Sequence, residues 1–180
     1  MTPTIADSTQ LDLTAFIRTI PDFPKAGILF RDIAPLLADP RALAGAIERL
    51  LAPWRNERID AVAAIEARGF LFATPLAMAL GVGLLPVRKP GKLPGATITH
   101  DYELEYGSDR LEMHTGMLPA GARVLVVDDV LATGGTAGAC LALIAASGAT
   151  VAGVAFLIEL QALGGRKKLA PHRVESVLVY

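Results

Sequence analysis

Two adjacent acidic residues stand between an apolar run and a glycine-rich turn in the segment VLVVDDVLATGGT, residues 124–136. The turn itself, Thr133-Gly134-Gly135-Thr136, precedes a stretch of helical character. At a helix N-terminus its backbone N–H groups and threonine hydroxyls would supply the donors that hold one phosphate, and glycine would let the phosphate approach the backbone closely. Taken by itself, the turn fits an ordinary threonine-capped strand-to-helix connection equally well.

The acidic pair, Asp128 and Asp129, makes the expected ligand more specific. A bare anion would be repelled by two carboxylates, whereas the hydroxyls of a sugar would donate hydrogen bonds to them. The helix dipole stabilises an acid at a helix start by about 0.3–1 kcal/mol, which accounts for one of the two residues. Because a ribose 5-phosphate carries both a diol and a phosphate, the segment favours a ribose phosphate site.

Two other phosphate motifs are excluded by spacing. Residues 134–138 lack the G-x-G-x-x-G order of a dinucleotide fold, although Glu159 lies at a suitable distance for the ribose-binding acid of such a fold. The lysine in Gly91-Lys92-Leu93 is followed by neither Ser nor Thr, and no apolar strand precedes it. A P-loop is therefore excluded as well.

The elements that must position these residues are strands alternating with helices. Apolar runs predict strands over residues 61–65, 83–87, 123–127, 150–158 and 174–179, and helical spacing predicts helices over 40–54, 70–80 and 135–147. Strands that are apolar on both faces indicate a parallel sheet covered on both sides, hence an α/β class. Ligands of such sheets bind at the carboxyl ends of the strands, where the sequence places residues 66–69, 88–89 and 128–129.

Residues 88–118 differ in character from the rest of the chain. They are rich in Gly, Pro, Thr and charge, with short alternating runs at 102–106 and 111–114. This composition predicts a long excursion with a weak hairpin. Because uncovered loops of that length are uncommon in compact domains, a functional lid is expected here.

Composition and charge limit the function classes. A chain of 180 residues fits one domain, and its formal net charge of -1 favours neither nucleic acid nor an anionic membrane as a partner. The single cysteine, Cys140, lies among apolar residues and is interpreted as a buried thiol, and no secretory signal opens the chain, so a cytoplasmic location is expected. His100, His114 and His172 lack metal-ligand spacing. The uncharged residues 141–158 are interpreted as a helix end, a turn and a strand, because Ser147-Gly148 interrupts them.

Six segments together carry a resemblance to a known family. The chain resembles the type I phosphoribosyltransferases, and among them the members that act on adenine. The resemblance implies a single domain over residues 1–180 with a mainly parallel, twisted sheet flanked by helices. It also implies a small N-terminal hood of about residues 1–35 and a flexible catalytic loop within 88–118. The matching segments are PDFPKAGILFRDI (21–33), EARGFLF (66–72), VRKPGKLPG (87–95), YELEYG (102–107), VVDDVLATGGT (126–136) and ELQALGGRKKL (159–169).

The resemblance implies an activity and its partners. The 5-phosphoribosyl group would pass from phosphoribosyl pyrophosphate to adenine, giving AMP and diphosphate in purine salvage. Mg²⁺ is the expected cofactor, held mainly by substrate oxygens rather than by a protein cage. A homodimer is implied, with residues 88–95 near its interface.

The resemblance also assigns residues to roles. Glu105 would be the general base that takes the ring proton of adenine, although Glu103 is equally placed on an alternating strand. A cis peptide between Glu66 and Ala67 would aim backbone groups at diphosphate. Phe30, which could also be a core residue, would stack on the base. The remaining assignments are Leu29 and Arg31 to adenine; Asp128, Asp129, Ala132, Thr133, Gly134, Gly135 and Thr136 to ribose phosphate; and Arg68, Arg88, Lys89, Lys92 and Tyr106 to diphosphate.

Three alternatives stay open at this point. The same fold could act on hypoxanthine, xanthine or orotate, which the segments around Glu105 and residues 28–33 disfavour. A regulator that senses phosphoribosyl pyrophosphate would need a DNA-binding module, and the residues before Pro21 are too few and not basic. A nucleotide-binding subunit without activity is the third.

Overall fold

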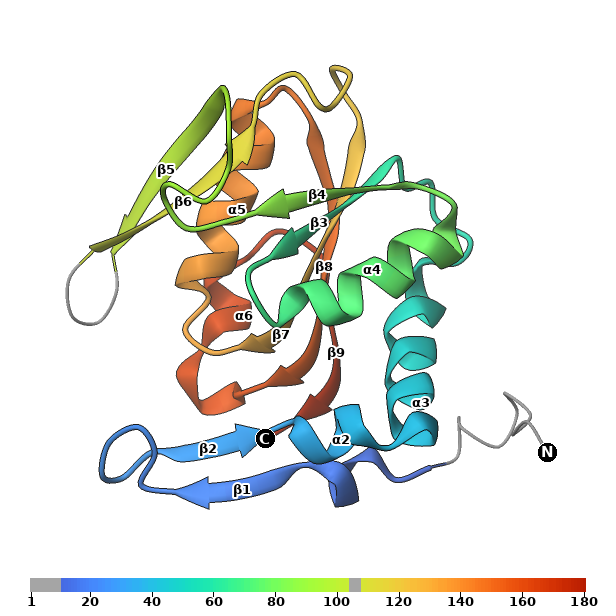
Figure 1. Ribbon diagram of the computed structural model, residues 1–180, viewed down its shortest axis with the longest axis vertical. Helices are drawn as coiled ribbons and strands as arrows, with labels where there is room; N and C mark the ends of the chain where they lie inside the picture. The colour runs from blue at the N-terminus through green and yellow to red at the C-terminus, as the bar shows by residue number, and fades with distance from the viewer. Residues whose placement is uncertain (1–10, 104–107) are drawn as a thin grey trace. The chain divides into compact units, whose positions relative to one another are not determined.

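The computed structural model describes residues 11–103 and 108–180 and divides the chain into two compact units, Met1–Arg49 and Leu50–Tyr180. Figure 1 shows the succession of elements in each unit. The predicted catalytic residues Glu105 and Tyr106 lie outside the described residues.

The N-terminal unit contains a short antiparallel hairpin followed by helices. After the 3-10 turn η1 (Leu13–Phe16), β1 (Arg18–Pro21) pairs with β2 (Leu29–Asp32), and α2 (Ala34–Ala38) and α3 (Pro40–Leu51) follow. α3 begins where the Asp39-Pro40 pair predicts, because Asp39 Oδ1 accepts hydrogen bonds from the backbone N–H groups of Arg41 and Ala42, at 2.8 and 3.0 Å.

The second unit is built on a five-stranded parallel sheet in the order β4-β3-β7-β8-β9. The predicted α/β class is thereby confirmed. Three helices and two 3-10 turns precede or connect these strands. The elements are η2 (Ala52–Trp54), β3 (Ala61–Ile65), α4 (Gly69–Leu80), β4 (Gly83–Val87), β7 (Arg123–Leu131), α5 (Gly135–Ala146), β8 (Thr150–Glu159), η3 (Gln161–Leu163), α6 (Gly165–Lys168) and β9 (Val174–Val179).

The central strands are buried on both faces, which explains their unbroken apolar character. Ala63 and Val126 belong to the core cluster that also contains α5, whereas their neighbours Val62 and Leu125 are fully buried on the opposite face. α4 packs on β3, β4 and β7, and it crosses one face of the sheet in Figure 1. Cys140 of α5 is completely buried, and this burial raises the pKa of its thiol. The prediction that Cys140 is a buried thiol is confirmed.

A second antiparallel hairpin, β5 (Thr97–Glu103) and β6 (Ser108–His114), occupies much of the excursion. It is longer and more regular than the weak hairpin predicted. Leu111 and Met113 of β6 are buried in the core, and the hairpin packs on α5, as Figure 1 shows. This packing stabilises strands that the polar sequence of the segment does not reveal.

β7 is also longer than predicted. The expected strand ends at Val127, but β7 continues to Leu131, so that Asp128 and Asp129 lie within a strand. Asp128, Val130 and Leu131 keep their pairing with β8, opposite Phe156, Ile158 and Glu159. The helix begins at Gly135, which removes the helix dipole as the local explanation for the acidic pair.

The apolar residues 141–158 form the end of α5, a turn and the strand β8, as predicted. Within the described ranges, no helix combines the length and the apolar character that crossing a membrane requires.

Candidate active site

A cavity of about 420 Å³ lies at the carboxyl ends of β3, β4 and β7. This is the edge of the sheet at which ligands of parallel sheets bind. All three predicted strand-end segments contribute to it, and the hairpin β5–β6 supplies part of its wall. The lining residues are Glu66, Ala67, Arg68, Lys89, Tyr102, Asp109, Leu111, Asp128, Asp129, Val130, Ala132 and Thr136.

A smaller cavity of about 80 Å³ adjoins it at the turn before α5. It is lined by Asp128 and by residues 130–137, which include every residue from Ala132 to Thr136 that the sequence assigns to ribose phosphate. Gly134, the residue before the helix, has a φ of 79°, a conformation that side chains disfavour. The predicted phosphate turn therefore stands at the N-terminus of a twelve-residue helix, next to the acidic pair.

The acidic pair is partly desolvated. Asp129 is 4 % exposed, and Asp128 Oδ1 accepts a 2.9 Å hydrogen bond from the backbone N–H of Asp129. Burial raises the pKa of both carboxyl groups, and the charge of Asp129 adds to the effect at Asp128. Two such carboxylates in one cavity are costly to keep ionised, which a donor ligand such as a diol would relieve.

Arg68 partly balances this charge. Its Nε lies 2.8 Å from Asp129 Oδ2 and forms an ion pair. The same Oδ2 is buried and accepts no hydrogen bond from the residues that the structure describes. The distance supports an electrostatic attraction, and the oxygen retains acceptor capacity for a hydrogen-bond donor.

Glu66 holds two of the predicted cations. Its Oε2 accepts a 2.8 Å hydrogen bond from Arg88 Nε, and its Oε1 accepts a 2.6 Å hydrogen bond from Lys92 Nζ. Burial would raise the pKa of Glu66, but Lys92, the backbone N–H of Lys89 and Arg88 outweigh it and lower the pKa. The Glu66–Ala67 peptide is cis, as the resemblance implied.

Lys89 is held by a residue that the sequence did not single out. Its Nζ lies 2.9 Å from Asp109 Oδ2, on the hairpin. Tyr102 of the same hairpin donates a 3.2 Å hydrogen bond to Asp109 Oδ2 and accepts a 3.3 Å hydrogen bond from Thr136 Oγ1. Asp109 lies in none of the matching segments, and Tyr102 lies in the YELEYG segment but was assigned no role. Their proximity depends on strand register, because they are direct partners across β5–β6.

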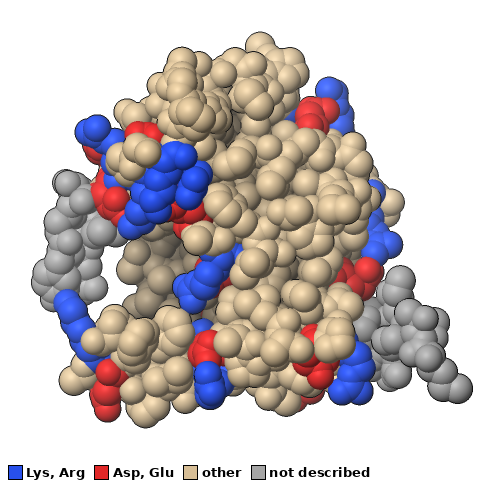
Figure 2. Space-filling model, in the orientation of Figure 1, with Lys and Arg blue, Asp and Glu red and all other residues tan. Residues whose placement is uncertain are grey.

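The four predicted diphosphate cations among the described residues are thus each paired with an acid of the same region. Figure 2 shows basic side chains lying directly beside acidic ones on the face in view. Within the described part of the chain, no cluster of three or more His, Cys, Asp or Glu side chains could hold a metal ion.

Two glycines bring other elements against the site. A Cβ on Gly69, at the start of α4, would lie 2.9 Å from Asp128 Oδ1. A Cβ on Gly165, at the start of α6, would lie 2.3 Å from the carbonyl oxygen of Ala132. Glycine at these positions lets α4 and α6 approach the acidic pair and the phosphate turn directly.

α6 is anchored by a buried carboxylate. Glu159, 4 % exposed, accepts hydrogen bonds from Arg166 Nε at 3.0 Å and Nη2 at 2.6 Å and from Ser176 Oγ at 2.7 Å. Glu159 therefore stabilises the position of α6, which packs against the phosphate turn. This structural role agrees with the exclusion of a dinucleotide fold, in which Glu159 would have bound a ribose.

The predicted adenine residues lie in the N-terminal unit, on β2. The Phe30 ring packs edge-on against Phe23, with centroids 5.1 Å apart, and Arg31 Nη1 donates a hydrogen bond to Thr19 Oγ1. The Leu29 side chain is exposed. Their contact with a base stays a prediction, as does the hood of about residues 1–35.

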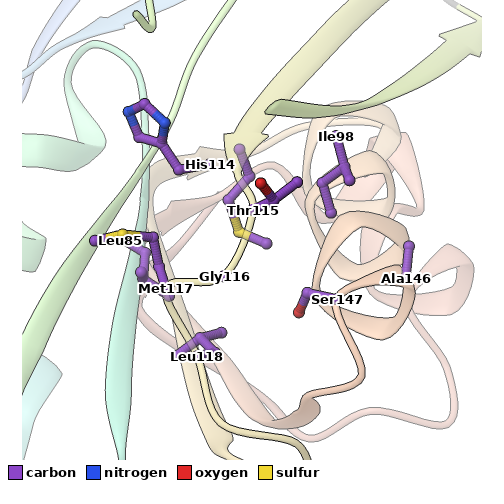
Figure 3. A pocket seen from close by; sticks show the side chains of 10 residues that line it. Leu85, Ile98, His114, Thr115, Gly116, Met117, Leu118, Ala146 and Ser147 are labelled. Carbon is purple, nitrogen blue, oxygen red and sulfur yellow. The ribbon is translucent and has the colours of Figure 1, made fainter. Parts of the chain in front are cut away.

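A further cavity, of about 230 Å³, is formed by β4, the base of the hairpin and the end of α5. Figure 3 shows apolar side chains such as Ile98 and Leu118 around it, with the His114 ring pointing away from the others. It lacks the paired acids and cations of the first cavity and is not a site for an anionic sugar.

Comparison with known proteins also indicates a phosphoribosyltransferase. Residues 36–177 match the phosphoribosyl transferase domain family. The chain is 55 % identical over 171 residues to the adenine phosphoribosyltransferase of Rhodopirellula baltica, covering 95 % of this chain and 83 % of that protein. It is 58 % identical over 168 residues to that of Methylococcus capsulatus, covering 93 % and 98 % of the two chains.

Solved structures are similar over nearly their whole length. The adenine phosphoribosyltransferase of Thermoanaerobacter pseudethanolicus has a TM-score of 0.90 at 48 % identity, with 98 % of this chain and 100 % of that chain covered. The Saccharomyces cerevisiae enzyme, solved with adenine and an imino-altritol bisphosphate, has a TM-score of 0.88 at 41 % identity, with 96 % and 99 % covered. The chain therefore belongs to the adenine phosphoribosyltransferases of the phosphoribosyl transferase domain family.

Proposed function

We propose that the chain transfers the 5-phosphoribosyl group of phosphoribosyl pyrophosphate to adenine and releases AMP and diphosphate, the pentosyltransferase reaction of purine salvage. One observation carries this proposal: two adjoining cavities bring a phosphate turn, a desolvated acidic pair and cationic side chains together at the carboxyl edge of the sheet. Membership of the family supports it independently.

The ribose phosphate would occupy the turn before α5. Backbone N–H groups of residues 132–136 and the hydroxyls of Thr133 and Thr136 would bind the 5-phosphate. Asp128 and Asp129 would accept hydrogen bonds from the ribose hydroxyls, which satisfies the acceptor capacity left at Asp129 Oδ2. The proposed pose resolves the repulsion between the acids and a bare anion, since the acids contact the sugar.

The leaving group would face the cations. Breaking the bond between the anomeric carbon and diphosphate sends the electron pair to diphosphate and leaves positive charge on the sugar. The negative charge on diphosphate would be stabilised by Arg68, Arg88, Lys89 and Lys92, together with Tyr106. The positive charge on the sugar would be stabilised by the acidic pair. The opposite charges of the cavity thus match the two charges that develop in the reaction.

Mg²⁺ fits this arrangement as an ion bound mainly through substrate oxygens. Proteins hold Mg²⁺ largely through substrate phosphates and one or two carboxylates, and the carboxylates of Asp128 and Asp129 line the cavity where phosphoribosyl pyrophosphate is proposed to bind. When bound, Mg²⁺ would neutralise part of the diphosphate charge.

Adenine would be bound by β2 and deprotonated by the hairpin loop. Phe30 offers an aromatic face, and the backbone groups of Leu29 and Arg31 offer donors and acceptors for the ring edge. Glu105 would accept the ring proton as the adenine nitrogen bonds to the anomeric carbon.

The activity is tested by AMP formation from labelled adenine, phosphoribosyl pyrophosphate and Mg²⁺. Product from hypoxanthine or orotate, with none from adenine, would refute the choice of base. Glu105→Gln should lower kcat by about 10²-fold or more while leaving KM little changed, with Glu103→Gln as the matched control. If Glu103→Gln shows the loss and Glu105→Gln does not, the general base has been misassigned.

We also propose a cytoplasmic homodimer with residues 88–95 near its interface. Leu71 and Met78 lie two helical turns apart on α4 and are 47 % and 77 % exposed, so a second copy could cover this apolar stripe. Sedimentation of a monomer under assay conditions would contradict the dimer.

A further inference from the structure

The pairing of Lys89 with Asp109 is unexpected in a cavity for a polyanion. Asp109 adds a negative charge to the wall where diphosphate is proposed to bind, and its Oδ2 lies 2.9 Å from the Nζ of Lys89. The carboxylate raises the pKa of Lys89, and Lys89 lowers the pKa of Asp109, so both groups are charged at neutral pH. Lys89, which is expected to bind diphosphate, is therefore already paired with Asp109.

This ion pair differs from the neighbouring pairs of Glu66 in its exposure. The Glu66 side chain is 5 % exposed and binds Arg88 and Lys92 together, so loss of either partner would leave a buried charge poorly compensated. The Lys89 and Asp109 side chains are 53 % and 22 % exposed. Water can solvate both groups once they separate, so breaking this ion pair costs little free energy. Lys89 can therefore leave Asp109 for another anion more easily than Arg88 or Lys92 can leave Glu66.

Asp109 is held in place by the hairpin. Tyr102 donates to the same Oδ2 that Lys89 contacts and also accepts a hydrogen bond from Thr136 of the phosphate turn. After Lys89 leaves, Asp109 would keep the Tyr102 hydroxyl as a donor. Asp109 can thus remain in the wall while Lys89 moves.

We propose that Asp109 is an internal competitor of diphosphate for Lys89, a residue that weakens the binding of phosphoribosyl pyrophosphate and of product diphosphate. The inference rests on the proposed function, because that function places diphosphate beside Lys89. Diphosphate carries more negative charge than the single carboxylate of Asp109, so it attracts the Lys89 ammonium more strongly and displaces Asp109. The competition makes binding weaker and allows Asp109 to recapture Lys89 as diphosphate leaves.

The test compares the affinity of the whole chain for Mg²⁺-diphosphate, measured by calorimetry, with that of Asp109→Asn. This variant keeps the side-chain shape and an acceptor for Tyr102 but removes the charge. An exposed ion pair changes an equilibrium constant by about five-fold at most, so Kd should fall by about two- to five-fold. KM for phosphoribosyl pyrophosphate should fall in parallel, without a rise in kcat.

Asp101→Asn is the matched control. Asp101 lies on the same hairpin and pairs with Arg110, with Nη2 2.9 Å from Oδ2, but it does not line the cavity. The Asp101→Asn substitution also removes one negative charge from the hairpin. It should leave Kd for Mg²⁺-diphosphate and KM for phosphoribosyl pyrophosphate unchanged. In the Lys89→Gln background, Asp109→Asn should lose its effect, since the competition requires Lys89.

An unchanged or weaker affinity in Asp109→Asn would overturn the inference, because Asp109 would then be neutral or would help to position Lys89. An equal effect of Asp101→Asn, or an effect that persists without Lys89, would overturn it as well. A wild-type chain that binds Mg²⁺-diphosphate but forms no AMP would count against the proposed function instead, so the two failures are distinguishable.

Discussion

Gly165→Ala is the most direct test of how the fold positions the phosphate turn. The added Cβ would lie 2.3 Å from the carbonyl oxygen of Ala132 and 2.7 Å from Leu131 Cδ1. To reach ordinary contact at about 3.4 Å, either α6 or the turn must move by about 1 Å. A misplacement of about 1 Å in a positioning group can cost on the order of 10²-fold in rate.

We therefore expect kcat/KM for phosphoribosyl pyrophosphate to fall by about 10- to 100-fold in Gly165→Ala. Overpacking should also destabilise the fold by about 1–3 kcal/mol, which thermal unfolding would measure. The loss of activity and the loss of stability have one cause, the clash with the carbonyl group of Ala132. Ala132 directly precedes Thr133 of the phosphate turn, so moving this carbonyl also moves the turn.

The control is Gly138→Ala in α5, where an added Cβ meets nothing within 4 Å. Alanine is favoured over glycine in a helix by about 1 kcal/mol, so this variant should be slightly more stable and equally active. If Gly165→Ala folds and keeps kcat/KM within about two-fold of wild type, the contact between α6 and the turn does not position the phosphate.

Two further predictions concern buried carboxylates. Asp128→Asn should raise the unfolding temperature of the ligand-free protein, because burial and the charge of Asp129 raise the pKa of Asp128 and make its ionised form costly at neutral pH. Turnover by this variant should fall. A lower unfolding temperature would contradict the prediction. Arg166→Met should destabilise the protein by about 1–2 kcal/mol, since Glu159 loses its guanidinium partner. Arg166 lowers the pKa of Glu159, so this stabilisation is present above the ordinary glutamate pKa and lost as pH falls through the lowered value. Denaturant titrations should therefore show the difference between wild type and Arg166→Met shrinking below about pH 4, and a constant difference would refute the assignment.

The strands of the sheet were predictable because burial on both faces requires continuous apolar runs. β3, β4 and β9 have the predicted bounds. β7 was predicted too short, since two charged residues mark the end of a strand when local preference is the guide. Its continuation depends on partners distant in sequence: β8 pairs with Asp128, and Arg68 lies beside Asp129.

The hairpin illustrates the same limit. Its polar alternation indicated two short strands, but the register that places Tyr102 opposite Asp109 follows from packing of Leu111 and Met113 in the core. A shift of one residue would turn both side chains to the other face. No local pattern distinguishes Asp109 from the neighbouring acids Asp101 and Glu112.

By itself, the sequence determined that an acidic pair, a glycine turn and clusters of cations stand at the ends of buried strands, because these features depend on residue type and short spacing. The tertiary structure decided which acid holds which cation and how closely Gly69 and Gly165 approach the site. Those contacts join residues far apart along the chain, and their distances are set by how helices and strands pack rather than by any local preference.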